Sequence, residues 1–138
     1  MIRNMKQDIT FDELFNHTIE FKDCELISAD KEKVVIRTIV NQSDVNPYGF
    51  AHGGYLFTLC DTICGTLGYC LGYYVVTQQA NINYIKSAKL NDELYVTAEA
   101  IHSGSSSDVC DVKIINQNGE LIAKAQFTLF NTQKIDIK

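Results

Sequence analysis

The sequence predicts an α+β fold in which an antiparallel sheet of about six strands wraps around one long central helix. Three observations predict it. Strand-like runs occupy both halves of the chain, a long apolar segment with helical periodicity separates them, and Asn118-Gly119 supplies a hairpin turn near the C-terminus. The length of 138 residues suits one domain, and we expect residues 1–138 to form it.

The first half of the chain predicts a short helix followed by two strands. Residues Thr10 to Glu13 match a capping box, and apolar residues follow at helical spacing. Residues 19–29 and 33–40 then contain alternating or β-branched side chains, which are typical of strands.

Residues 54–71 predict the long helix. At 100° per residue, the apolar side chains fall on one face and a stripe of small residues falls on the other. A helix this apolar is buried on most sides, so we expect the sheet to cover its Leu/Ile face. The small stripe would then let another backbone or a ligand approach closely. The apolar face comprises Leu56, Leu59, Ile63, Leu67 and Cys70, and the stripe comprises Gly54, Thr58, Asp61, Gly65, Gly68 and Gly72.

The second half of the chain predicts four more strands, over residues 74–85, 93–101, 109–115 and 121–130. A membrane span over residues 55–76 is disfavoured, because Asp61 lies within it and no Lys or Arg flanks it closely.

Composition excludes several classes of function. The net charge of −5 argues against nucleic-acid binding, which needs a basic face. The five cysteines are typical of small buried side chains, and their odd number and the absence of an apolar leader in residues 1–15 favour reduced thiols in a cytoplasmic protein. Cys60 and Cys64 are spaced as metal ligands could be, but no CxxC pair accompanies them, so we expect no metal site.

Asp61 is the only formally charged residue between Val45 and Ile85. A carboxylate in such surroundings is either satisfied by specific partners or has a raised pKa. Cores avoid an unpaired Asp, so its presence points to a chemical task. The alternative is structural: Asp61 caps a neighbouring loop or ties two subunits together.

The segment before the helix predicts an anion-binding helix start. Asn46 precedes a turn at residues 47–49, and His52-Gly53-Gly54 opens the helix. A helix N-terminus offers unpaired N–H groups and a partial positive charge, and glycines there let a substrate atom approach. These groups could hold a carbonyl oxygen as it becomes an oxyanion. Taken alone, a glycine-rich helix start is more often a turn, and a histidine such as His52 is more often structural.

Together, Asn46, His52-Gly53-Gly54 and Asp61 resemble the motif of the hotdog-fold acyl-CoA thioesterases of the PaaI-like family. The family pattern places Asn six residues before His-Gly-Gly and Asp nine residues after the His, as here. The resemblance covers nearly the whole chain and is sharpest over residues 46–69 and 82–100. It implies the hotdog fold and a homodimer as the minimal active unit, often assembled into a homotetramer. It also implies active sites in which Asp61 of one chain faces the helix start of the other.

The resemblance also implies a reaction and its residues. An acyl-CoA or aryl-acyl-CoA thioester is hydrolysed to free acid and CoA, with no metal or other cofactor. The N–H of Gly53, together with that of Gly54, polarises the carbonyl, and Asp61 is the general base or the nucleophile. Asn46 and His52 orient the loop, the carbonyl or the leaving thiolate. Thr77, on the strand after the helix, is the best match for the residue that positions the water, and its polar neighbours Gln78 and Gln79 are the alternatives.

Further residues are expected to contact the substrate: Gly54, Phe57, Gln78, Gly104 and Ser105. Gly104-Ser105 departs from the family pattern, because many members carry Arg or Lys after this Gly, where a basic side chain would contact the CoA phosphates. The alternatives for those contacts are Lys86, Lys89 and Lys134.

Two other functions remain compatible with the sequence. One is a dehydratase acting on a 3-hydroxyacyl thioester, with His52 and Asp61 as acid and base. The other is a non-catalytic acyl-CoA-binding or regulatory module, which would explain the missing basic residue at Ser105.

Overall fold

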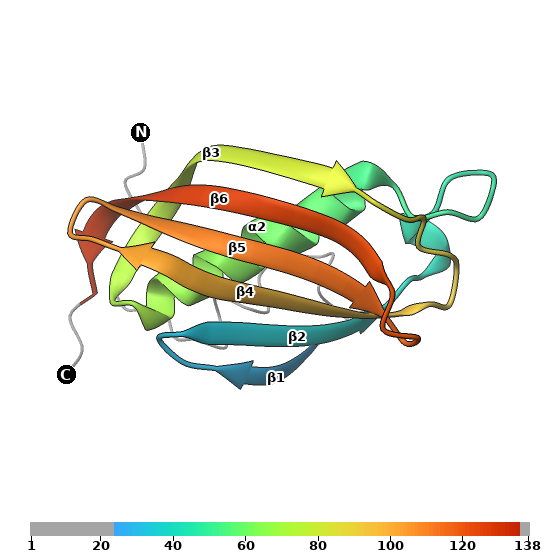
Figure 1. Ribbon diagram of the computed structural model, residues 1–138, viewed down its shortest axis with the longest axis horizontal. Coiled ribbons are helices and arrows are strands. Elements are labelled where there is room, and N and C mark those ends of the chain that lie inside the picture. The colour runs from blue at the N-terminus through green and yellow to red at the C-terminus, as the bar shows by residue number, and fades with distance from the viewer. Residues whose placement is uncertain (1–23, 136–138) are drawn as a thin grey trace.

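A computed structural model of the protein describes residues 24–135. One six-stranded sheet covers one long helix, α2, and neighbouring strands are antiparallel (Figure 1). The sheet order is β1-β2-β4-β5-β6-β3. The strands are β1 (Glu25–Ala29), β2 (Lys33–Ile39), β3 (Tyr73–Tyr84), β4 (Glu93–Ser103), β5 (Ser107–Asn116) and β6 (Leu121–Lys134), and the helix α2 is Gly53–Cys70.

The predicted fold class is confirmed, and several element bounds shift by a few residues. The expected first helix and residues 19–23 of the first expected strand lie outside the described residues. α2 begins one residue earlier than predicted, with His52 as its N-cap. β6 runs on to Lys134 because it pairs with the start of β3, where Tyr73 lies opposite Lys134. Such long-range pairing is not visible in the local alternation of side chains.

The core forms between α2 and the sheet. As predicted, Leu56, Leu59, Ile63 and Leu67 of the helix are buried, whereas Cys70, at the helix end, is only half-buried. Fully burying a side chain of this size contributes roughly 1.5–3 kcal/mol, so this face fixes the helix against the sheet. The strands contribute the other large buried side chains, among them Ile36, Leu94, Ile114, Ile122, Phe127 and Leu129.

The small-residue stripe of α2 has two different surroundings. A Cβ on Gly68 would lie 2.8 Å from both methyl carbons of Val75, so this glycine lets the helix backbone approach β3 of the same chain. The small stripe was expected to let another backbone or a ligand approach closely, and at Gly68 the approaching backbone is that of β3. A Cβ on Gly54 or Gly65 would meet no atom within 4 Å.

β3 is an edge strand of 12 residues and follows α2 after a tight turn. Gly72 occupies that turn with a φ of 101°, a left-handed conformation that favours glycine. Between Thr77 and Gln79 the pairing with β6 slips by one residue, which makes Gln78 the extra residue of a β-bulge. Bulges re-aim neighbouring side chains and are frequent beside active sites.

Residues 24–135 contain no helix long and apolar enough to cross a membrane. The same residues contain no group of three His, Cys, Asp or Glu side chains placed to hold a metal ion.

Candidate active site

The start of α2 presents backbone amides that no protein group in residues 24–135 occupies. The first helical hydrogen bond runs from the Leu56 N–H to the His52 carbonyl, at 3.2 Å. The N–H groups of Gly53 and Gly54 precede it and remain available to a ligand. The His52 side chain makes no capping hydrogen bond and is exposed, so it does not compete for them.

Asn46 shapes the loop that leads to this helix start. Its side-chain oxygen accepts hydrogen bonds from the N–H groups of Tyr48 (2.9 Å) and Phe50 (3.1 Å). The loop then reaches the helix through a hydrogen bond from the His52 N–H to the Asp44 carbonyl, at 2.9 Å. In this arrangement Asn46 acts on the loop that positions the amides of Gly53 and Gly54.

Asp61 and Thr77 contact each other, although they come from different elements. The Thr77 hydroxyl on β3 donates to Oδ1 of Asp61, halfway along α2, over 2.5 Å. Asp61 is half-buried and Thr77 is exposed, so the pair borders solvent. The hydrogen bond fixes one carboxylate oxygen and leaves the other to act on a ligand. The exposed bulge residue Gln78 lies beside this pair on β3.

The two halves of the candidate site are separated within one chain. Gly53 and Asp61 are eight positions apart on the same helix. At 1.5 Å per residue that is about 12 Å along the axis, and the two positions point about 80° apart around it. The Asp61 carboxylate and the amides of its own helix start therefore cannot meet at one reacting atom.

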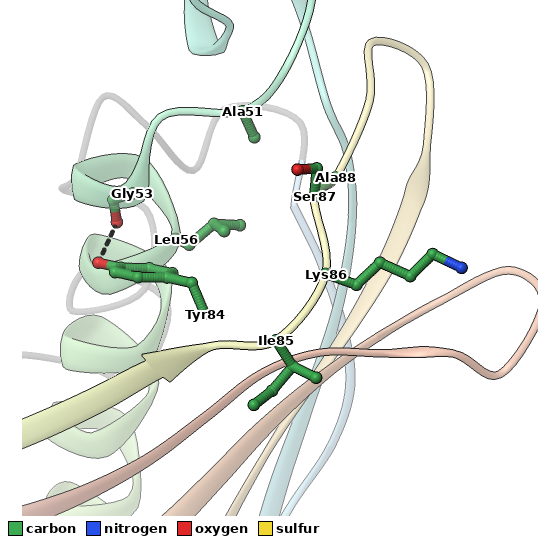
Figure 2. Close-up of a pocket in the computed structure, with 8 residues that line it drawn as sticks. All are labelled: Ala51, Gly53, Leu56, Tyr84, Ile85, Lys86, Ser87 and Ala88. Atoms are coloured by element: carbon green, nitrogen blue, oxygen red, sulfur yellow. Dashed lines mark hydrogen bonds between the residues drawn. The ribbon is translucent and has the colours of Figure 1, made fainter.

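A pocket of about 290 Å³ lies against the helix start (Figure 2). Its lining includes Ala51, Gly53, Leu56, Tyr84 and the segment 85–88. The Tyr84 hydroxyl donates to the Gly53 carbonyl over 2.8 Å. Burial, with a smaller contribution from the nearby Cys60 thiol, raises the pKa of Tyr84. Tyr84 was not predicted from the sequence, where its one signal is an aromatic side chain with a polar tip at the end of the strand after the helix.

The other expected substrate contacts lie away from this pocket. Phe57 is half-buried, and its ring packs on Phe127, with centroids 5.3 Å apart. Gly104 and Ser105 form the β4–β5 turn, where Asn131 donates to the Gly104 carbonyl over 3.0 Å. In the register of the sheet, this turn is level with Val76 of β3. Because β5 and β3 are two strands apart, the turn lies about 10 Å from Val76 across the sheet.

The lysines expected to replace the basic turn residue have distinct positions. Lys86 forms an ion pair with Glu120, and its side chain extends away from the pocket (Figure 2). Lys134 lies at the end of β6, opposite Tyr73, and Lys89 lies in the loop before β4, opposite Phe50.

The thiols near Asp61 in the helix are unreactive. Burial, and then the charge of Asp61, raises the pKa of Cys60 to about 12. A hydrogen bond with Cys110 and burial raise the pKa of Cys64 well above its usual range. Both thiols stay protonated near neutral pH, so neither is a nucleophile.

Comparison with known proteins identifies the family. The family model described as the thioesterase superfamily matches residues 48–123. Acyl-coenzyme A thioesterase 13 of Mus musculus is 32% identical, over 75% of this chain and 76% of that protein. Acyl-coenzyme A thioesterase PaaI of Escherichia coli K12 is 29% identical, over 72% of this chain and 71% of that protein.

Solved structures agree with this result. A hypothetical thioesterase of Streptococcus pneumoniae TIGR4, crystallised with coenzyme A, is 41% identical with a TM-score of 0.88, covering 92% of this chain and 100% of that one. A Streptococcus mutans UA159 protein bound to acetyl-CoA is 43% identical with a TM-score of 0.81, covering 88% of this chain and 100% of that one. The chain therefore belongs to the thioesterase superfamily and has its hotdog fold.

Proposed function

We propose that the protein hydrolyses acyl-CoA thioesters to a free acid and CoA. The observation that carries the proposal is the Asp61–Thr77 hydrogen bond, which holds a carboxylate in place in a segment with no other charged residue. The names of the curated relatives from Mus musculus and Escherichia coli, and the coenzyme A and acetyl-CoA in the streptococcal structures, support this substrate class.

The minimal active unit in this proposal is a homodimer. One chain keeps its Asp61 about 12 Å along the helix from its own amides, so a second chain must bring its helix start to that carboxylate. The edge strand β3 carries Thr77, and within residues 24–135 its outer row of backbone groups pairs with no other strand, which suits pairing with a second copy. Two such dimers would form the expected homotetramer.

The chemistry follows from the two halves of the site. The N–H groups of Gly53 and Gly54 stabilise negative charge on the thioester oxygen. Asp61, held by Thr77, takes a proton from water as the new C–O bond forms, or attacks the carbonyl carbon itself. In the first route, Asp61 passes this proton to the CoA sulfur as the C–S bond breaks. In the second route, the C–S bond breaks to leave a mixed anhydride on Asp61; water then hydrolyses the anhydride to the free acid, and the proton from this water goes to the CoA thiolate. Asn46 keeps the amides in place, and His52 flanks the carbonyl or the leaving sulfur.

Variants of the pneumococcal relative support these roles. Two of its crystal structures contain single alanine replacements of an aspartate and a threonine that are sixteen residues apart in that chain. Asp61 and Thr77 have the same spacing and are in direct contact here. Those two replacements match the pair that we place at the reacting atoms.

In this proposal the reaction needs no cofactor, and other residues contact the rest of the substrate. The turn at Gly104 and Ser105 lies at the end of the sheet that is nearer to Thr77, and in this proposal it contacts the CoA portion of the substrate. Gln78 contacts the pantetheine arm from the bulge. Phe57 reaches the acyl group only from the core side of the helix. We expect the reaction to take place in the cytoplasm, where the five thiols stay reduced.

Thiol release from short, medium, long and aryl-acyl CoA esters tests the proposal. Asp61→Asn should lower kcat by about 10²–10⁴, the usual contribution of a general base, and leave substrate binding intact. Asp111→Asn is the matched control, because this carboxylate lies on β5 and faces Lys124. Retention of most of kcat by Asp61→Asn would refute the catalytic role.

The same panel separates the alternatives. A dehydratase would change the ultraviolet absorbance of an enoyl-CoA without releasing thiol. A binding module would bind acyl-CoA tightly with no turnover by the wild-type protein.

A further inference from the structure

Tyr84 lies where it can act on the oxyanion-binding amides, and its role extends the proposed function. It is the last residue of β3, and its side chain crosses to the first residue of α2 (Figure 2). The hydroxyl donates to the Gly53 carbonyl over 2.8 Å. A Cβ on Gly53 would stand 3.0 Å from Cζ of the Tyr84 ring and 3.1 Å from its oxygen.

The Gly53 carbonyl and the Gly54 N–H belong to one planar peptide group. A hydrogen bond to the carbonyl therefore fixes the direction of that N–H. It also polarises the peptide and strengthens the N–H as a donor, by about 10–30% per bond in condensed-phase estimates. The Gly54 N–H precedes the first intrahelical hydrogen bond, so the polarised donor faces the ligand side of the helix start.

The ring of Tyr84 accounts for the glycine at position 53. The backbone there is ordinary helix, so no left-handed φ requires a glycine. The ring lies in the space that any larger side chain would occupy. Tyr84 and Gly53 thus form a matched pair in which the missing side chain lets the phenol reach the carbonyl.

The pocket surroundings keep the hydroxyl in its donor form. Leu56 and Ala88 form buried parts of the wall, and 51% of the Tyr84 surface remains exposed. The pKa of Tyr84 lies above its ordinary value, chiefly because of burial, so the phenol stays protonated at neutral pH. Asp61 and Lys86 are the only charged residues in the segment 53–88, and Lys86 extends away from the pocket to Glu120.

We propose that Tyr84 is a positioning residue for thioester hydrolysis, which orients and polarises the Gly53–Gly54 peptide so that the Gly54 N–H binds the developing oxyanion. The inference rests on the proposed function. It adds a residue that acts through the backbone and does not touch the reacting atoms.

Two measurements on Tyr84→Phe test this role, because the variant keeps the ring and removes only the hydroxyl. In the hydrolysis assay, kcat should fall about 5-fold with KM unchanged, the effect of losing one neutral hydrogen bond in the transition state. In ¹H–¹⁵N spectra of the free protein, the Gly54 amide proton should move upfield while that of Gly65 stays in place. Tyr73→Phe, at the other end of β3, is the matched control and should change neither quantity.

Unchanged kcat, or a loss of thermal stability with kcat of the folded protein unchanged, would overturn the positioning role. An unchanged Gly54 amide shift would overturn it even in a protein without turnover. Absence of hydrolysis by the wild-type chain would instead refute the proposed function. The two failures are therefore distinguishable.

Discussion

The contact between Gly68 and Val75 can be tested by substitutions at two glycines of one helix. Gly68→Ala and Gly65→Ala make the same change in the interior of α2. By helix propensity alone, each substitution should raise the free energy of unfolding by about 1 kcal/mol, because Ala favours the helix over Gly by that amount. Only Gly68→Ala places a Cβ 2.8 Å from both methyl carbons of Val75, whereas the Cβ at Gly65 meets nothing within 4 Å.

The clash at Gly68 has a definite size. Val75 is β-branched and stiff at χ1, so it cannot rotate both methyl groups away, and forcing extra volume into a packed site costs about 1–3 kcal/mol. Because the helix term is common to the two variants, Gly68→Ala should be less stable than Gly65→Ala by about 1–3 kcal/mol. For a chain of this length that difference corresponds to roughly 3–10 °C in Tm.

Urea denaturation followed by far-UV circular dichroism measures this difference. The double variant Gly68→Ala/Val75→Ala should recover most of the loss relative to Val75→Ala alone, because it removes the methyl carbons that the new Cβ meets. Equal stability of the two single variants would show that the helix does not approach β3 as closely as described.

Three further predictions follow from the contacts near the site. Stability should fall as pH rises above 9, because the unfolded chain releases the Cys60 proton there while the folded chain keeps it to about pH 12; Cys60→Ala should flatten this loss in urea titrations at several pH values, and an unchanged slope would contradict it. Asn46→Ala should speed amide hydrogen exchange at Tyr48 and Phe50 and destabilise their loop by about 1–2 kcal/mol, whereas Asn46→Asp keeps the accepting oxygen and should not. Ser105→Arg should lower KM for acyl-CoA about 2–5-fold, because a guanidinium binds phosphate strongly; an unchanged KM would place the CoA phosphates elsewhere.

Much of the fold could be predicted because one face of each element is buried. Leu59 and Ile63 repeat at helical spacing because both meet the sheet, and Val112 and Ile114 of β5 alternate because both meet the helix. The order of the strands and the bulge at Gln78 depend on pairing between distant segments, so no local pattern shows them.

The candidate site likewise contains residues that a local sequence pattern predicts and residues that it does not. The spacing of Asn46, His52 and Asp61 is a local signature, and the contact of Thr77 with Asp61 follows once the strand after the helix returns beside it. The contact of Tyr84 could not be predicted, because its partner is a backbone carbonyl, and every residue of a sequence has one. The close approach at Gly68 was expected, but only the tertiary structure shows that β3 of the same chain, through Val75, makes it.

The gap of eight positions between Gly53 and Asp61 has a consequence for how the protein works in the cell. In the proposed dimer, Asp61 and the amides that stabilise the charge come from different polypeptides, so the rate would depend on how much of the chain is dimeric. Below the dissociation constant of the pair, the rate would fall with the square of the amount of chain present. Changes in expression level would then act on thioester turnover more steeply than in a monomeric hydrolase.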